Sequence, residues 1–148
     1  MEAVIFCGAP GSGKSTFFKE HFFDTHLRIS LDLLRTRKRE RLFFDTALKA
    51  GQRLVIDNTN PTADNRRLYI EAARAAHFTL AGYYFTAGFE EALERNNLRT
   101  GRARVPEAAI KSFLAKLERP ALAEGFDRLY QVAVEDSRFL VSELKHEI

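Results

Sequence analysis

Short apolar runs alternate with longer amphipathic stretches along the chain. The short runs are rich in Val, Ile and Leu, as in Leu54–Ile56, and this pattern is typical of buried strands. The longer stretches repeat apolar residues at helical spacing with charged residues between them, which predicts amphipathic helices. The expected strands are Ala3–Cys7, Leu27–Ser30, Arg53–Asp57, Phe78–Thr86 and Leu129–Val134, and the expected helices are Lys14–Phe23, Leu33–Ala50, Ala63–His77, Phe89–Arg99 and Pro106–Arg119.

This alternation predicts βαβ units, and therefore an α/β fold of three layers in which helices cover both faces of a mostly parallel central sheet. Ligands of such sheets bind outside the carboxyl ends of the strands. The loops that follow the expected strands are therefore the places to look for chemistry. The pattern assigns no element to Glu135–Ile148.

Length and composition favour a globular chain. The sequence has 148 residues, of which 45% are apolar and 29% charged, a balance that excludes a disordered chain. Domains cluster at about 100–150 residues, so we expect a single domain over residues 1–148.

Other whole-chain features exclude several classes of protein. A single cysteine excludes a disulfide framework and a multi-cysteine zinc site. No apolar run approaches the roughly 20 residues that span a membrane, and the first residues lack the basic start of a signal peptide. We therefore expect a cytoplasmic protein without a membrane partner. The net charge of +3 permits an anionic partner without requiring one.

The loop after the first expected strand carries the most specific motif of the chain. Residues 8–15 match G-x-x-x-x-G-K-[ST] without a mismatch, between a strand and a helix, as the P-loop requires. Its backbone N–H groups and the positive end of the following helix surround phosphates, Lys14 reaches the β- and γ-phosphates, and the Ser15 hydroxyl binds Mg²⁺. The motif predicts a P-loop NTPase sandwich that binds ATP and Mg²⁺. The expected nucleotide-binding residues are Gly8, Ala9, Pro10, Gly11, Ser12, Gly13, Lys14, Ser15 and Thr16.

Two acids follow other expected strands. Asp32 and Arg35 are three residues apart at the start of the expected helix 33–50, and this spacing places them on one face. A carboxylate near the γ-phosphate can accept the proton of an attacking hydroxyl, although Asp32 can equally be a helix cap. Asp57 ends the third strand, as a Walker-B acid does, and can order Mg²⁺.

Two arginines of the expected helix 89–99 are further candidates. Arg95 and Arg99 are four residues apart, so they share one helical face. Arginines above a phosphate site can neutralise the charge of the transferring group. A solvated basic face explains the same spacing without any function.

Several runs of the sequence resemble one family. The P-loop segment Gly8–Phe17 comes first, and the later runs are Ser30–Arg35, Val55–Pro61, Arg95–Arg99 and Leu122–Phe126. In this order they resemble the 5′-hydroxyl polynucleotide kinases, in particular the kinase half of the animal bifunctional kinase–phosphatase. The resemblance extends from about Val4 to Leu129.

The resemblance implies an activity and a role for each candidate. It implies ATP-dependent phosphorylation of the 5′-hydroxyl of a DNA or RNA end. Asp32 would be the general base, Arg35 would lie beside the acceptor end, and Arg95 and Arg99 would be lid arginines that hold the nucleotide phosphates.

The sequence departs from the family at two points. The family has Asn-Arg before its aspartate where this chain has Ser30 and Leu31, and the Asp-x-Asp-Gly-Thr motif of the phosphatase half is absent from the sequence, so removal of 3′-phosphates is not expected. A small-molecule kinase of the gluconate or antibiotic type, and a non-catalytic ATP-binding module, remain alternatives.

Overall fold

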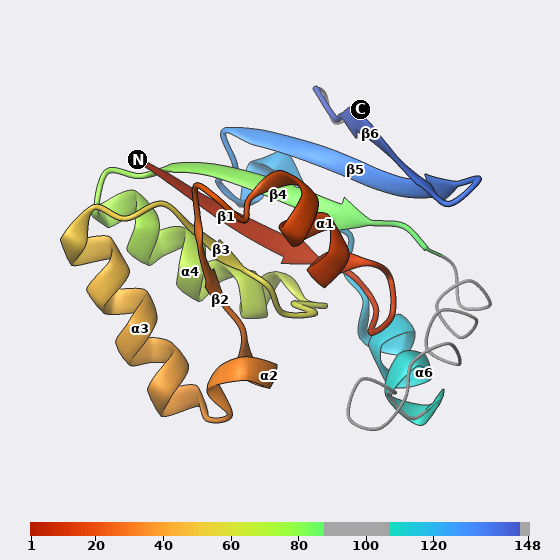
Figure 1. The fold of residues 1–148 in the computed structure, drawn as a ribbon, viewed down its shortest axis with the longest axis horizontal. Helices are drawn as coiled ribbons and strands as arrows, with labels where there is room; N and C mark the ends of the chain where they lie inside the picture. The colour runs from red at the N-terminus through yellow and green to blue at the C-terminus, as the bar shows by residue number, and fades with distance from the viewer. Residues whose placement is uncertain (88–106, 146–148) are drawn as a thin grey trace.

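The computed structural model describes residues 1–87 and 107–145, and the chain alternates strands and helices as the sequence predicts (Figure 1). The elements in order are β1 (Glu2–Cys7), α1 (Lys14–His21), β2 (Leu27–Ile29), α2 (Leu31–Leu34), α3 (Arg37–Ala50), β3 (Leu54–Ile56), α4 (Ala63–Ala75), β4 (Thr79–Phe85), α6 (Glu107–Lys116), the 3₁₀ helix η2 (Leu122–Glu124), β5 (Arg128–Glu135) and β6 (Arg138–Glu143). The expected helix 89–99 lies outside the described residues.

The strands form one six-stranded sheet in the order β2-β3-β1-β4-β5-β6. The pairs from β2 to β5 are parallel, and β6 returns antiparallel to β5. The expected α/β fold with a mostly parallel sheet is therefore confirmed. Because the chain moves from central β1 to β2 on one side and later to β4 on the other, the carboxyl end of β1 is a topological switch point, where such sheets bind ligands.

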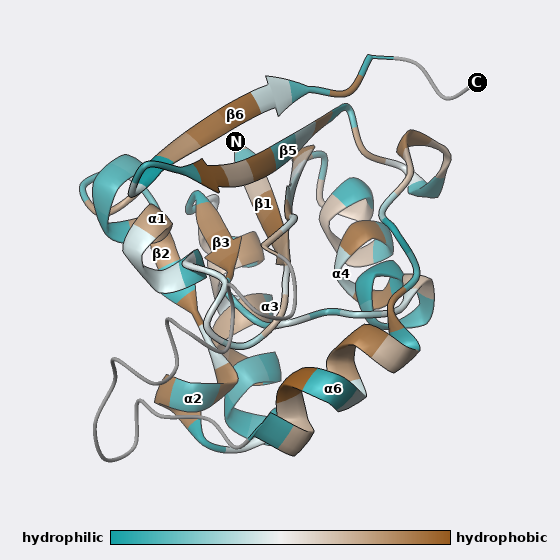
Figure 2. Cartoon of the chain, turned by 90° about the vertical axis from the view of Figure 1, so that its right-hand side faces the viewer, coloured by the Kyte–Doolittle hydropathy of each residue, from teal (hydrophilic) through white to brown (hydrophobic). Residues whose placement is uncertain are grey.

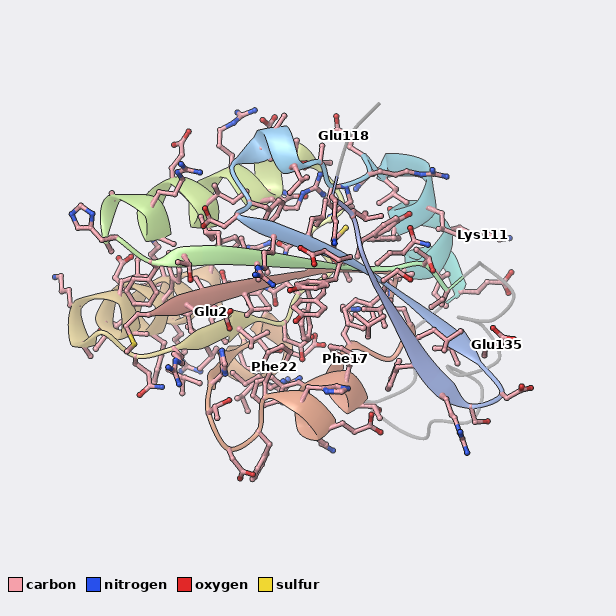
Figure 3. All side chains as sticks on the ribbon, turned by 90° about the horizontal axis from the view of Figure 1, so that it is seen from above. Glu2, Phe17, Phe22, Lys111, Glu118 and Glu135 are labelled. Atoms are coloured by element: carbon pink, nitrogen blue, oxygen red, sulfur yellow. The ribbon has the colours of Figure 1, made fainter. Side chains whose placement is uncertain are left out.

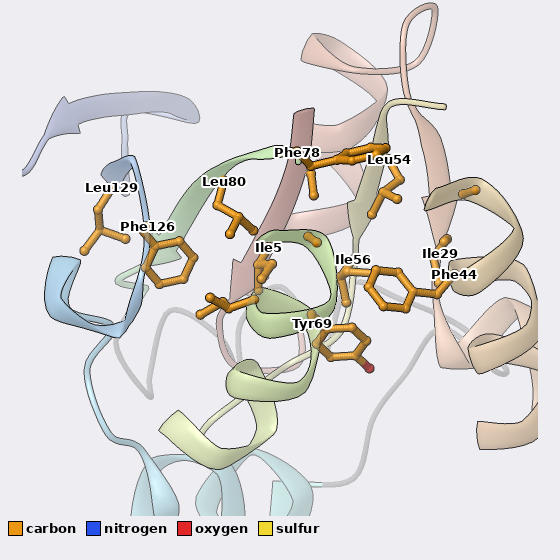
Figure 4. Packing of buried hydrophobic residues seen from close by; sticks show 14 residues of the cluster. Ile5, Ile29, Phe44, Leu54, Ile56, Tyr69, Phe78, Leu80, Phe126 and Leu129 are labelled. Carbon is orange, nitrogen blue, oxygen red and sulfur yellow. The ribbon is translucent and has the colours of Figure 1, made fainter. Parts of the chain in front are cut away.

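Alternate residues of β1 enter two different cores, which makes the fold three-layered. Ile5 packs in one cluster with Phe44 of α3 and Tyr69 of α4 (Figure 4). Phe6 packs in the other with Phe17 of α1, at a ring-centroid distance of 6.0 Å. Figure 3 labels Phe17 of α1 and Phe22, the C-cap residue of that helix, and both side chains lie between the helix and the sheet. In Figure 2 the central strands β1 and β3 are mostly brown, whereas helices such as α2 and α6 carry both teal and brown residues.

The expected helix 33–50 is interrupted. The chain forms the short α2, turns at Arg35, whose φ is +77°, and restarts as α3. Thr36 caps α3, since its hydroxyl accepts a hydrogen bond from the Arg39 amide at 3.1 Å. The expectation that Asp32 and Arg35 share one helical face is therefore wrong.

The unassigned end of the sequence contains β6. Asp136 and Ser137 form the turn from β5 with φ values of +50° and +61°, which is the backbone of a two-residue hairpin with both central residues left-handed. Phe139 of β6 packs edge-on against Phe17 at 5.1 Å between ring centroids, so the hairpin closes the α1 side of the core. Within the described ranges, no helix has the length and apolar character to cross a membrane.

Candidate active site

The P-loop has the backbone that its glycines permit. Gly11 and Gly13 adopt φ values of +82° and +101°, which side chains with a Cβ rarely accept. Gly8 is needed for space, because a Cβ there would lie 2.7 Å from both the Phe85 Cβ and the Ser12 Oγ. The loop leads directly into α1, so its backbone and the positive end of that helix face the same point.

Lys14 begins α1 and its side chain folds back over the loop. Its Nζ donates to the carbonyl oxygens of Gly8 at 3.0 Å and Ala9 at 2.9 Å, and the residue is only 9% exposed. The P-loop is further tied to the loop after β3, since the Gly8 amide donates to the Thr59 carbonyl at 3.0 Å. The ammonium group is therefore held inside the concave face of the loop.

Ser15 and Asp57 lie together, as the sequence predicts for a magnesium pair. The Ser15 hydroxyl donates to Asp57 Oδ2 at 3.3 Å, and Asp57 is buried at the end of β3. A hydroxyl and a carboxylate are ligands that suit Mg²⁺, which takes few protein oxygens and several from water and phosphate. The pair therefore fits the metal.

Arg28 belongs to this cluster and was missed in the sequence. Its Nε donates to Asp57 Oδ2 at 2.8 Å and an amino group donates to the Ser15 hydroxyl at 3.1 Å. The guanidinium therefore competes with a divalent cation for the same oxygens. The signal for it was a lone charge between Leu27 and Ile29 in an otherwise apolar strand.

One cavity joins the P-loop to α2. The P-loop residues Lys14 and Ser15 line it together with Asp32 and Arg37. The segment after β3, residues 57–61, also lines it. The full lining is Pro10, Gly11, Lys14, Ser15, Leu31, Asp32, Arg37, Asp57, Asn58, Thr59, Asn60, Pro61 and Asn65.

The structure brings Asp32 into this cavity but not Arg35. Asp32 is exposed and lies in the first turn of α2, whose cap position is Ser30, so the alternative interpretation of Asp32 as the helix cap is wrong. Arg35 is exposed at the end of α2 and does not line the cavity. Arg37, two residues later, lines it instead. Arg95 and Arg99 lie outside the described residues.

Asn60, in the run Val55–Pro61, has a structural role. It is buried with φ of +45°, and its amide donates to the Phe6 carbonyl at 2.8 Å. Asn tolerates this left-handed backbone better than most residues. Asn60 therefore fixes the loop after β3 against β1.

Glu124, in the run Leu122–Phe126, is connected to the cavity lining through Arg66. It receives two hydrogen bonds, of 2.8 and 3.0 Å, from Arg66 of α4, a fully buried arginine. Arg66 also donates to the Asn60 carbonyl at 2.8 Å. This ion pair joins η2 to α4, and Arg66 extends the connection to Asn60 in the cavity lining. Glu124 therefore has a structural role, and Arg66 was not anticipated from the sequence.

The chain is similar in sequence to curated proteins over most of its length. The bifunctional polynucleotide phosphatase/kinase of Schizosaccharomyces pombe is 30% identical over 136 residues, which are 89% of this chain and 33% of that protein. The chain therefore spans about a third of the length of this curated relative. The resemblance to polynucleotide kinases is confirmed as a similarity over most of the chain.

Solved structures share the fold. Kti12 of Chaetomium thermophilum, in complex with ADP-AlF3, has a TM-score of 0.67 at 19% identity and covers 90% of each chain. A gluconokinase of Sinorhizobium meliloti has a TM-score of 0.63 at 20% identity, over 89% of this chain and 82% of that one. The fold is thus a P-loop kinase fold, which implies nucleotide binding.

The family assignment rests on a match over most of the chain. The model of the AAA_33 family, described as an AAA domain, matches residues 4–120. This range includes the P-loop, the segment after β3 and every residue that lines the cavity. The chain therefore belongs to the AAA_33 family of AAA domains, with the fold of P-loop kinases.

Proposed function

We propose that this chain transfers the γ-phosphate of ATP to the 5′-hydroxyl end of a polynucleotide. The observation that carries the proposal is that Asp32 lines the same cavity as Lys14 and Ser15. An acid that faces a P-loop is what a hydroxyl-phosphorylating enzyme needs and a simple nucleotide-binding module does not. We assign the reaction to one domain over residues 1–148, because strands from Glu2 to Glu143 share a sheet.

The donor side of the site would bind Mg-ATP. Lys14 and the loop amides would hold the β- and γ-phosphates, with Thr16 beside them in the first turn of α1. Ser15 and Asp57 would hold Mg²⁺, which neutralises phosphate charge when bound. Since Arg28 already contacts both side chains, metal binding requires the guanidinium to withdraw from them.

The acceptor side would supply the base. The acceptor hydroxyl gives its proton to the Asp32 carboxylate as its oxygen bonds to the γ-phosphorus, and the bond from that phosphorus to the β–γ bridging oxygen breaks to release ADP. Following the family resemblance, Arg95 and Arg99 would neutralise charge on the transferring group. Such arginines act by electrostatic stabilisation of the transition state.

The polynucleotide acceptor is supported by the sequence similarity. The relative from Schizosaccharomyces pombe is named a bifunctional polynucleotide phosphatase/kinase. The exposed arginine that lines the acceptor side, Arg37, also suits an anionic acceptor.

A small-molecule kinase is the second candidate. Ser30 and Leu31 stand where the polynucleotide kinases have Asn-Arg, which removes an arginine from the acceptor side. The gluconokinase shares only the fold with this chain. A small hydroxylated acceptor would need fewer cations than a nucleic acid end.

One labelling experiment separates these functions. The protein is incubated with γ-labelled ATP, Mg²⁺ and matched oligonucleotides that end in a 5′-hydroxyl or a 5′-phosphate, in DNA and RNA. We expect label only on 5′-hydroxyl ends. Label on gluconate or an aminoglycoside instead would favour the small-molecule kinase, and ATP binding without transfer to any acceptor would favour the binding module.

A further inference from the structure

A buried carboxylate outside the P-loop organises the acceptor side of the cavity. Glu40 of α3 is only 3% exposed. It accepts hydrogen bonds from the Tyr69 hydroxyl at 2.6 Å, from the Asn58 amide and from Arg37 at 3.3 Å. Burial, together with the bond to Glu40, raises the pKa of Tyr69, so its hydroxyl stays protonated and donates.

Asn58 connects Glu40 to the element that carries Asp32. Its Oδ1 accepts a hydrogen bond at 2.9 Å from the amide of Leu31, the first residue of α2. The preceding residue, Asp57, is tied to Ser15 of the P-loop. Consecutive residues at the end of β3 therefore fix the donor side and the acceptor side of the cavity relative to each other.

The charge of Glu40 determines how Asn58 is oriented. An ionised carboxylate only accepts hydrogen bonds, whereas an amide both donates and accepts. Glu40 therefore requires the NH₂ group of Asn58 to face it, and this leaves the amide oxygen to meet the Leu31 N–H. An apolar residue at position 40 would fill the same space without imposing this orientation.

α2 has few other anchors. Its four residues, Leu31–Leu34, include none that is buried, and of these only Leu34 packs partly against the core. The turn at Arg35 separates α2 from α3, so the longer helix does not continue its hydrogen-bond ladder. The bond from Leu31 to Asn58 is therefore a main determinant of where Asp32 lies.

We propose that Glu40 is a positioning residue: through Asn58 it sets α2 so that Asp32 faces the P-loop. The catalytic consequence rests on the proposed function, in which Asp32 is the base. The positioning itself is a property of the folded chain and can be tested without an acceptor.

Moving the negative charge from position 40 to position 58 tests the hydrogen-bond chain from Glu40 through Asn58 to Leu31. In Asn58→Asp a second carboxylate faces Glu40, so the bond is replaced by repulsion and α2 is released. In the double variant Glu40→Gln/Asn58→Asp the Gln amide donates to Asp, whose other oxygen again accepts from Leu31. A misplacement of about 1 Å can cost 10²-fold in rate, so we expect kcat of Asn58→Asp to fall at least about tenfold and the double variant to recover to within about threefold of the unmutated protein.

Two readouts separate positioning from other effects. The amides of residues 31–34 should exchange hydrogen faster in Asn58→Asp than in the unmutated protein, and at the unmutated rate in the double variant. In Asn58→Asp, KM for ATP should change less than kcat. Added negative charge acting directly on ATP would persist in the double variant. Phe78→Leu, a core change before β4, is the control: it should lower the melting temperature and leave kcat per folded molecule unchanged.

The outcomes distinguish this inference from the proposed function. Two results would overturn the positioning role of Glu40. One is a folded double variant whose hydrogen exchange and kcat equal those of Asn58→Asp. The other is an Asn58→Asp variant whose hydrogen exchange at residues 31–34 equals that of the unmutated protein. If the unmutated protein phosphorylates no 5′-hydroxyl, the proposed function fails, and with it the catalytic consequence, whereas the hydrogen-exchange pattern still decides whether Glu40 positions α2.

Discussion

Arg37 and Arg35 differ in their relation to the cavity although they are two residues apart. Arg37 lines the cavity, and one of its amino groups is held by Glu40 and by Tyr69 at 3.2 Å. Hydrogen bonds to charged groups are worth about 1.5–3 kcal/mol, so Arg37→Ala should raise KM for an oligonucleotide acceptor at least about tenfold. Arg35→Ala is the matched control and should change KM less than about twofold, since an exposed side chain away from the cavity contributes little. Equal KM values for the two variants would contradict this assignment.

Arg28 predicts an unusual metal dependence. Its replacement by Gln leaves the buried Asp57 carboxylate without its guanidinium, so the melting temperature without ligands should fall. Mg²⁺ then meets a carboxylate that no cation occupies, and half-maximal nucleotide binding should need less Mg²⁺. Titration of Mg²⁺ with a non-hydrolysable ATP analogue, followed by thermal melting, measures both effects. Arg53→Gln, an exposed change beside β3, is the control. An unchanged Mg²⁺ requirement would mean that Asp57 does not meet the metal.

The residues recognised in the sequence and those that were not differ in how far along the chain their partners lie. The P-loop residues were predictable because their chemistry depends on a contiguous motif that lies between a strand and a helix. Arg28 and Glu40 act through partners that are 29 and 18 positions away, which the sequence does not reveal. Their signal was a charge in an apolar setting, since Glu40 shares the buried stripe of α3 with Phe44 and Ala47.

At the scale of elements, the break between α2 and α3 shows what periodicity leaves out. No Gly or Pro interrupts the sequence between Leu33 and Ala50, so the pattern predicted one helix. The signal for a new start was Thr36, a favourable cap, whose β-region backbone ends the preceding turn. The break moves Asp32 onto its own short element and thereby determines the geometry of the candidate site.

The ion pair between Arg66 and Glu124 predicts a stability effect at the same scale. It joins α4 to η2, and the Arg66 side chain is 0% exposed. Loss of one partner of a buried pair costs about 3–5 kcal/mol, and the partial exposure of Glu124 places Glu124→Gln at the lower end, about 3 kcal/mol. Urea unfolding of both proteins measures the change.

The same variant should keep its turnover per folded molecule, because Glu124 does not line the cavity. The exposed Glu71→Gln on α4 is the control and should unfold as the unmutated protein does. A loss of activity without a loss of stability would contradict the structural interpretation of Glu124.

At the scale of the whole molecule, the sheet was predictable because alternating strands and helices leave few topologies. The alternation predicted the parallel strands β1 to β5 and placed the site at their carboxyl edge. It did not predict β6, since a two-residue turn of Asp136 and Ser137 lacks the usual Asn-Gly or Asp-Gly signal.

Alkaline pH should weaken the whole fold through Cys7. Burial raises the pKa of its thiol from 9.0 to about 11, although Arg66 and Lys14 oppose the shift. Because the unfolded chain releases this proton first, the contribution of Cys7 is present below pH 9 and is lost as pH rises toward 11. Urea unfolding at pH 8 and pH 10.5 should therefore show a larger loss of stability in the unmutated protein than in Cys7→Ala. Equal losses would contradict the prediction.

The proposed phosphorylation of polynucleotide ends depends most directly on Asp32, which lines the same cavity as the P-loop residues Lys14 and Ser15. The most direct measurement compares the unmutated protein with Asp32→Asn for initial transfer rate to one 5′-hydroxyl oligonucleotide, for nucleotide affinity and for melting temperature, on the same preparations. Because Asp32 is exposed and is not the helix cap, stability and nucleotide affinity should stay nearly unchanged. Loss of a general base costs about 10²–10⁴ in rate, so transfer should fall at least a hundredfold. If a folded, nucleotide-binding Asp32→Asn variant keeps a transfer rate within about tenfold of the unmutated protein, Asp32 is not the general base of this chain.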